Sequence, residues 1–237
     1  MDKKDHSWQS PSLGKTISLR VYGTEGTPLI AFPGDSGKRI DWEQHGLIDA
    51  LSFQIENGHN QIFCLDSVDH ESFFNTAVMP RIRINRHRQY ESFIVDEVVP
   101  FIRKTSENDF IMAAGIHMGG YHALNLLLKY PEKIKKAISV SGRFQIRPFM
   151  DDYFDESVYY NNPLEYLPNL DEENVLDGIR KCDIRLVITP DDPYADLNYM
   201  LSDILRSKSV DHVFDYWIET GENPWKIRGD ILQRHVP

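Results

Sequence analysis

The fold of this chain is decided by residues 110–141, which read FIMAAGIHMGGYHALNLLLKYPEKIKKAISVS. An apolar run of strand length leads into Gly115-Ile116-His117-Met118-Gly119-Gly120, and a helical pattern and a second apolar run follow. Strand, tight turn, helix and strand in this order are typical of a parallel βαβ unit. Glycines are expected in the turn, because a side chain at Gly115 or Gly119 would collide with neighbouring backbone.

The rest of the chain repeats this alternation of strand-length apolar runs and helical patterns. It predicts one α/β domain over residues 1–237, with a mostly parallel central sheet and helices on both faces. Strands are predicted at 17–22, 28–32, 61–65, 109–114, 136–141, 184–189 and 213–218, and helices at 41–55, 88–104, 118–129, 171–181, 195–207 and 225–234.

A loop-rich excursion at about 143–170 interrupts the alternation. It is rich in Tyr, Asn, Asp and Pro, and we expect it to cover a cleft at the carboxyl end of the sheet, where open α/β sheets bind ligands. Its aromatic side chains either line that cleft or pack on the sheet edge, and the sequence leaves both alternatives open.

Composition excludes several classes of function. The chain has 237 residues and a formal net charge of −10, so we expect no nucleic acid partner. No run of 18 apolar residues and no apolar leader occurs, so no membrane span or secretion signal is expected. The two cysteines, Cys64 and Cys182, have no CxxC spacing and predict neither a disulfide framework nor a zinc site. These features favour a cytoplasmic protein.

The turn at residues 115–120 resembles the nucleophile elbow of α/β hydrolases, G-x-S-x-G followed by another Gly. Four further segments resemble one family of that fold, the putative-esterase family, close to esterase D and the tributyrin-esterase type. The resemblance covers nearly the whole chain and implies the α/β-hydrolase fold and carboxylic-ester chemistry. The segments are Phe32-Pro33-Gly34-Asp35-Ser36-Gly37, Cys64-Leu65-Asp66-Ser67-Val68-Asp69, Arg86-His87-Arg88-Gln89-Tyr90-Glu91 and Asn161-Asn162-Pro163-Leu164-Glu165-Tyr166-Leu167-Pro168.

The resemblance implies a catalytic triad, and this chain departs from it. The family needs a serine at the elbow, an acid after the next-to-last strand and a histidine after the last strand. His117 stands at the serine position, whereas Asp192 matches the acid, with Asp191 as a neighbour that could substitute. At the histidine position the alignment gives Gly221 or Glu222.

Two nearby histidines do not fill the gap. His212 begins the last predicted strand, roughly 20 Å from the loop at ~3.3 Å per residue. His235 follows the last predicted helix, about 15 Å away at ~1.5 Å per residue. Two of the three triad positions have therefore changed.

The oxyanion donors are expected to remain, namely the Met118 N–H and an N–H from the loop at Gly34 or Asp35. We therefore take Gly34, Asp35, Ser36 and Met118 as candidate ligand-binding residues. The leading hypothesis is a non-catalytic homologue that binds a small, anionic ligand or a partner in the old cleft.

Two alternatives stay open. A rewired hydrolase would use His117 as base or nucleophile, oriented by Asp192 or Glu222. A structural or assembly role, with the chain forming a homo-oligomer, is the third hypothesis. No cofactor is implied, and one histidine among scattered carboxylates is a weak metal signal, so no metal site is predicted.

Other residues receive structural interpretations. His122, one turn into the elbow helix, is expected to pack or hydrogen-bond under the loop. His87 and His45 are predicted to be loop and helix-surface residues. The basic run at 81–88 is predicted to be a solvated loop and helix start, or else a holder of an anionic ligand near the cleft.

Overall fold

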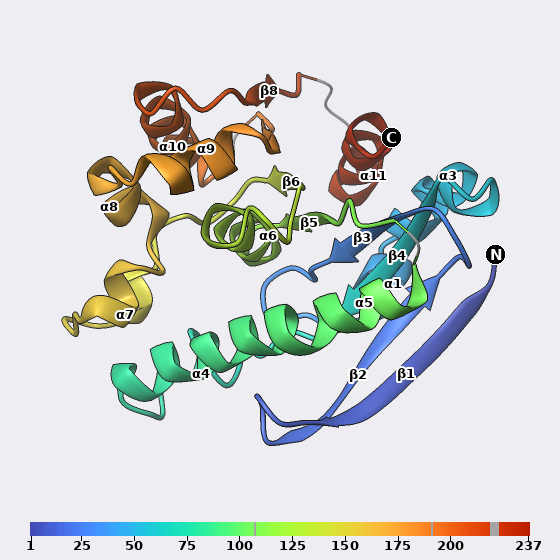
Figure 1. Cartoon of the computed structure of the whole chain (residues 1–237), viewed down its shortest axis with the longest axis horizontal. Helices are drawn as coiled ribbons and strands as arrows, with labels where there is room; N and C mark the ends of the chain where they lie inside the picture. Colours follow the sequence, from blue (N-terminus) through green and yellow to red (C-terminus); the bar gives the residue numbers. More distant parts are fainter. Residues whose placement is uncertain (107, 191, 219–222) are drawn as a thin grey trace.

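The computed structural model describes residues 1–106, 108–190, 192–218 and 223–237. These form an eight-stranded sheet in the order β1-β2-β4-β3-β5-β6-β7-β8, covered by helices (Figure 1). The strands are β1 (Lys3–Ser10), β2 (Lys15–Tyr22), β3 (Thr27–Ala31), β4 (Asn60–Leu65), β5 (Met112–Ile116), β6 (Lys136–Val140), β7 (Asp183–Ile188) and β8 (Val213–Tyr216).

From β3 onward, helices alternate with the strands, as the sequence predicted. They are α1 (Asp41–Gln44), α2 (Leu47–Ala50), α3 (Ser52–Glu56), α4 (Pro80–Phe93), α5 (Val99–Thr105), α6 (Met118–Lys129), α7 (Glu156–Tyr159), α8 (Pro163–Tyr166), α9 (Glu173–Arg180), α10 (Ala195–Ser207) and α11 (Pro224–His235). Short 3₁₀ turns occupy Arg147–Phe149 and Leu167–Asn169. Figure 1 shows α7 and α8, in yellow to orange, projecting beyond the strands.

The strands from β4 to β8 in the sheet order pair in parallel, and β1–β2 and β2–β4 pair antiparallel. The mostly parallel sheet with helices is therefore confirmed. The sheet separates two apolar clusters, because successive strand residues such as Leu29 and Ile30 point to opposite faces. Helices α4, α5, α6, α9 and α10 cover one face, and α1, α2, α3 and α11 cover the other.

Three elements differ from the sequence prediction. Strand β1 was not predicted, because it is a mostly exposed, polar strand at the sheet edge. The helix predicted at 41–55 is three short helices, interrupted at Gly46, which has φ 75°. The helix predicted at 88–104 begins at Pro80 and contains a π-helical segment at Ile94–Val98. Pro100 explains that segment, because it lacks the N–H that an α-helix would use there.

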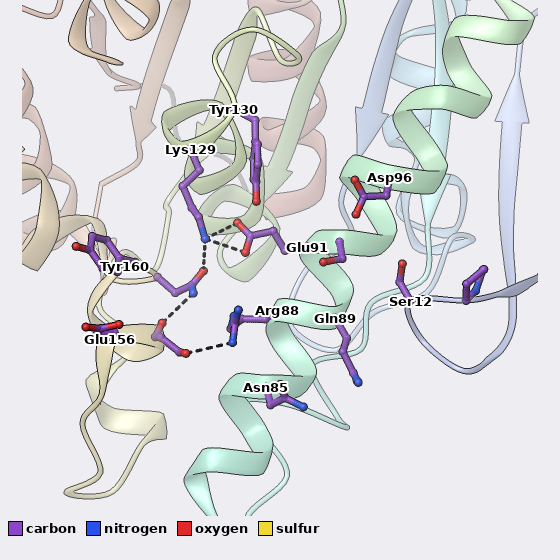
Figure 2. A pocket seen from close by; sticks show the side chains of 14 residues that line it. Ser12, Asn85, Arg88, Gln89, Glu91, Asp96, Lys129, Tyr130, Glu156 and Tyr160 are labelled. Atoms are coloured by element: carbon purple, nitrogen blue, oxygen red, sulfur yellow. Dashed lines mark hydrogen bonds and ion pairs between the residues drawn. The ribbon is translucent and has the colours of Figure 1, made fainter. Parts of the chain in front are cut away.

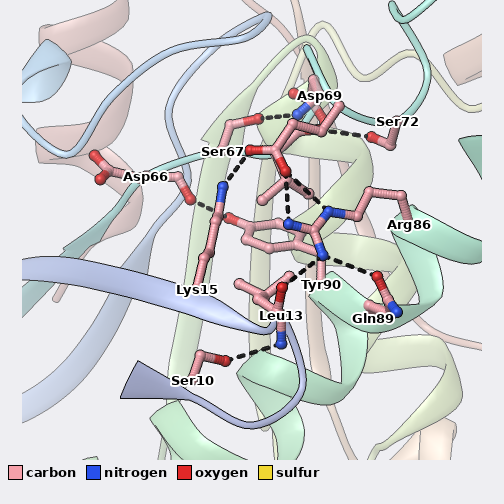
Figure 3. A network of polar contacts seen from close by, with 12 residues as sticks. Ser10, Leu13, Lys15, Asp66, Ser67, Asp69, Ser72, Arg86, Gln89 and Tyr90 are labelled. Atoms are coloured by element: carbon pink, nitrogen blue, oxygen red, sulfur yellow. Dashed lines mark hydrogen bonds and ion pairs between the residues drawn. The ribbon is translucent and has the colours of Figure 1, made fainter. Parts of the chain in front are cut away.

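A polar network ties the β1–β2 turn to α4 and to the loop after β4 (Figure 3). The Glu71 carboxylate accepts hydrogen bonds from Lys15 and from Arg86, whose Nη2 lies 2.6 Å away. Arg86 also donates to the carbonyl of Leu13 at 2.9 Å. The network holds the loop that carries Asp69 beneath the elbow.

The basic run at 81–88 is a correction to the sequence prediction. The predicted helix start is correct, since the run forms the first turns of α4, but no part of it is a loop and Arg83 is only 4% exposed. Arg83 donates to the carbonyl of Phe149 at 2.8 Å, so this cation supports the excursion from below.

The elbow glycines sit where a side chain has no room. A Cβ at Gly119 would lie 2.4 Å from the carbonyl oxygen of Pro33, whereas a Cβ at Gly34 would meet nothing within 4 Å. We expect Gly119→Ala to lower the free energy of unfolding by about 1–3 kcal/mol, because the backbone must shift to relieve the overlap. Gly34→Ala is the matched control, and urea unfolding of both variants makes the comparison. Equal unfolding midpoints would contradict this packing.

Along the described residues, no helix is both long and apolar enough to cross a bilayer.

Candidate functional site

The elbow between β5 and α6 is strained at His117. This residue has φ 53° and ψ −112°, a conformation that non-glycine residues rarely adopt. Its N–H donates to the carbonyl of Val140 at 3.0 Å, which fixes the turn against β6. The same strained turn is what presents a nucleophile in α/β hydrolases. We call the polar group gathered around it the elbow site: Asp35, His117, Met118, Arg143, Asp192, Tyr194 and Arg228.

The His117 ring is engaged by an arginine from the last helix. Arg228 Nη2 lies 3.2 Å from His117 Nε2. A guanidinium can only donate, so Nε2 accepts, and the proton of the neutral ring is assigned to Nδ1. Burial and the charge of Arg228 lower the pKa of His117. The imidazole is therefore neutral near neutral pH, and its Nε2 lone pair is occupied.

Arg228 itself packs on an aromatic ring and is influenced by the charge of the candidate acid. Its guanidinium sits 4.5 Å from the centre of the Trp225 ring. Burial lowers the pKa of Arg228, and the charge of Asp192 opposes that shift. The elbow site thus has acid, arginine and imidazole where the family pattern has acid, imidazole and hydroxyl.

Asp192 keeps one oxygen available. Its Oδ1 accepts the N–H of Tyr194 at 2.8 Å. Its Oδ2 is buried and has no hydrogen-bond partner among the described residues. Glu222 and Gly221, the two alignments of the triad histidine, lie outside the described residues, as does Asp191.

The proposed oxyanion donor is already bonded within the chain. The Met118 N–H donates to Asp35 Oδ1 at 3.1 Å, and Arg143 Nη1 donates to Asp35 Oδ2 at 2.9 Å. Asp35 is thus an acceptor at the elbow. Of the other predicted loop residues, Gly34 accepts the N–H of Gly37 at 3.1 Å, and Ser36 donates its N–H to Asp69 at 3.3 Å.

Arg143 follows β6 and is surrounded by aromatic rings. Its guanidinium lies 4.8 Å from the ring centre of Phe149, 5.0 Å from that of Tyr194 and 5.6 Å from that of Phe74. Phe149 comes from the predicted excursion, so part of that segment packs at the elbow site. That the excursion covers a cleft stays a prediction.

Sequence reasoning missed both arginines. Arg143 had a signal, because it follows Ser141-Gly142 at the carboxyl end of a strand, where open α/β sheets bind ligands. Arg228 had a weaker signal. It lies one helical turn after Pro224-Trp225, so it is on the same side of the last helix as the first residues of that helix.

The nearby histidines have partners elsewhere. His212 Nε2 lies 2.7 Å from Ser202 Oγ, and His235 Nε2 lies 3.1 Å from Asp215 Oδ2. Neither of them therefore takes the triad role at His117.

A buried histidine–aspartate pair lies under the elbow loop. His122 Nε2 is 2.9 Å from Asp69 Oδ1, and the side chains are 3% and 0% exposed. Burial alone would raise the pKa of Asp69, but the charge and hydrogen bond of His122 lower it on balance. Asp69 also accepts the Ser36 N–H, so the pair holds the loop that carries Asp35.

Of the two histidines predicted at the surface, His87 is buried and His45 is exposed. His87 is only 2% exposed, and its Nε2 lies 3.2 Å from Asn161 Oδ1. Burial holds its pKa well below the usual value. His45 is exposed but stacks on Trp225 with ring centres 3.7 Å apart. His87 is buried because the rings of Phe73 and Tyr121 pack against it and Asn161 of the excursion contacts its Nε2.

A separate cavity of about 730 Å³ opens between α4, the end of α6 and α7 (Figure 2). Lys129 in its wall is bonded to Glu91 at 2.6 Å and to Asn161 at 3.0 Å, and Arg88 donates to Ser157 at 3.4 Å. None of the elbow-site residues lines it. Its cations are neutralised or bonded within the wall, so we place the candidate site at the elbow instead. Across the described ranges, no group of three or more His, Cys, Asp or Glu is arranged to hold a metal ion.

Solved structures share the whole fold. A ferulic acid esterase superposes with a TM-score of 0.78 at 18% identity, covering 99% of this chain and 96% of that one. An S-formylglutathione hydrolase from Agrobacterium tumefaciens gives 0.77 at 13% identity, covering 98% and 92%. One from Staphylococcus aureus gives 0.70 at 17% identity, covering 99% and 94%. At these identities the likeness establishes the α/β-hydrolase fold alone.

No curated protein matches the sequence significantly. The profile of one family, described as "Putative esterase", matches residues 42–236. This span includes the elbow, the excursion, Asp192 and the last helix, and it is most of the chain. The chain belongs to this esterase family of the α/β-hydrolase fold.

Proposed function

We propose that this esterase-family protein binds a small anionic ligand at the elbow site and does not hydrolyse esters. The observation that carries the proposal is the convergence of three donors around His117. They are the Met118 N–H, Arg143 and Arg228.

These donors suit an anion for two physical reasons. The Met118 N–H stands at the N-terminus of α6, a helix of 12 residues, where the helix dipole favours negative charge. The Arg143 guanidinium is held by aromatic rings, so it loses little freedom when it pairs with an oxyanion.

The state of His117 supports a binding role. A base or nucleophile needs a free lone pair, and here Arg228 donates to Nε2. The neighbouring arginine also favours the neutral ring and disfavours its protonation during any reaction. The imidazole serves instead as a wall and as an acceptor that positions Arg228.

Ester hydrolysis by a rearranged site is the second candidate function. The strained elbow at His117 and the partnerless Oδ2 of Asp192 favour it. Ester hydrolysis requires Arg228 to move away from His117 Nε2, so that the imidazole can accept a proton or attack the ester.

Calorimetric titration with acetate and with inorganic phosphate, at low ionic strength, tests the binding role. Arg143→Gln is expected to weaken binding of the bound anion about tenfold or more, because a hydrogen bond to a charged group contributes about 1.5–3 kcal/mol. Arg147→Gln is the matched control, since Arg147 pairs with Glu165 at 3.7 Å and stacks on Phe154, away from the elbow. If neither anion binds the wild-type chain, or if both variants bind equally well, the proposal fails.

A further inference from the structure

We infer that the Asp35 side chain is a built-in competitor at the elbow site, and that the ligand is a carboxylate that displaces it. The inference rests on the proposed binding function and extends it to the ligand class and to a device that limits affinity.

The contacts of Asp35 define a carboxylate position. One oxygen accepts the Met118 N–H at 3.1 Å, and the other accepts from Arg143 at 2.9 Å. A single planar group thus bridges the helix N-terminus and the guanidinium. A carboxylate on a ligand would make the same two contacts once Asp35 has moved away.

Asp35 can leave without unfolding its loop. The Asp35 side chain is 36% exposed, and its carboxylate contacts the Met118 N–H and Arg143. The loop backbone is fixed independently, because Ser36 N–H bonds Asp69, Gly37 N–H bonds Gly34, and Ser67 N–H bonds the carbonyl of Gly37. A rotation of one side chain therefore opens the position.

The receiving groups stay in place when Asp35 leaves. Arg143 remains against the rings of Phe149 and Tyr194, at 4.8 and 5.0 Å from their centres. The Met118 N–H is fixed by α6. The ligand carboxylate takes the position of the Asp35 carboxylate, so the Met118 N–H and Arg143 each keep an anionic acceptor in the complex.

The same geometry disfavours phosphate. A doubly charged tetrahedral group would place extra negative charge near Asp192, whose field already reaches His117 and Arg228. A singly charged planar group matches the charge and shape of the side chain that occupies the position. The ligand class is therefore a carboxylic acid in its ionised form.

Competition from Asp35 lowers the apparent affinity for the ligand, because the ligand can bind only during the fraction of time that the position is open. An occupancy by Asp35 of about nine-tenths means that removing the carboxylate strengthens acetate binding about tenfold. Asp35→Ala removes both contacts, and Asp35→Asn keeps the shape while removing the charge.

The test is a calorimetric titration of acetate and inorganic phosphate into wild type, Asp35→Ala, Asp35→Asn and Asp49→Ala. Asp49 is exposed on α2, so its variant controls for the loss of one negative surface charge. We expect acetate to bind both Asp35 variants about tenfold more tightly than it binds wild type or Asp49→Ala.

Three other outcomes overturn the inference, and they are distinguishable. Acetate binding of equal strength to wild type and to the Asp35 variants leaves the anion site standing but removes Asp35 as its competitor. A larger gain for phosphate than for acetate overturns the ligand class. No binding of either anion to any variant overturns the proposed function, and the inference fails with it.

Discussion

Release of p-nitrophenol from p-nitrophenyl acetate by the wild-type chain is expected to be about 10⁶-fold slower than by an enzyme with an intact Ser, His and Asp triad. His117→Ala is expected to leave this rate unchanged. The reason lies in the elbow site, where Arg228 donates to His117 Nε2 and Asp35 accepts the Met118 N–H. An ester would find no free nucleophile, and it would have to displace Asp35 to reach the Met118 N–H.

Initial rates against a buffer blank measure this, with enzyme in large excess over any contaminating esterase. The double variant His117→Ser/Gly221→His, built on the family pattern, is expected to exceed wild type by about 10²-fold, because a nucleophile and its base act as a unit. The binding account is wrong if wild type turns over clearly above the blank and His117→Ala abolishes that turnover. The rewired hydrolase would then be the correct function.

Removing His122 is expected to cost about 3–5 kcal/mol in the free energy of unfolding, because it leaves the carboxylate of Asp69 buried without its partner. The two groups are 2.9 Å apart, and Asp69 is fully buried. Urea unfolding of His122→Ala makes the measurement. His70→Ala is the control, since His70 is exposed, and its effect should stay within about 0.5 kcal/mol.

The pair also predicts a pH dependence. The pKa of Asp69 in the folded chain lies below its ordinary value of 3.8, so the unfolded chain takes up the proton first as the pH falls. The stability due to the pair is therefore present above about pH 3.8 and is lost below it. His122→Ala should lack this acid-linked loss. A loss in the variant as steep as in wild type would show that other groups cause it.

The sequence predicted the sheet and the elbow because those features depend on local patterns. The run at 110–141 contains a complete strand, turn and helix. Gly115 and Gly119 in its sequence indicate the two positions where neighbouring backbone leaves no room for a side chain. Strand β1 escaped prediction because an edge strand needs no apolar run.

The contacts of the elbow site were beyond sequence reasoning because they join distant segments. Arg228 meets His117 across 111 positions, and Arg143 meets Asp35 across 108. His87 was predicted to be a surface residue, and it is buried because Phe73, Tyr121 and Asn161 pack around it. Side-chain direction and packing of the excursion decide these contacts, and neither is encoded in a local pattern.

The most direct test of the account is an NMR titration of acetate into isotope-labelled wild type, following the Met118 amide and the guanidinium of Arg143. We expect saturable shifts of both signals in wild type. The Met118 shift should saturate at about tenfold lower acetate in Asp35→Ala and at about tenfold higher acetate in Arg143→Gln. Shifts confined to the cavity around Lys129, or no shift of Met118 at any acetate concentration, would contradict an anion site at the elbow.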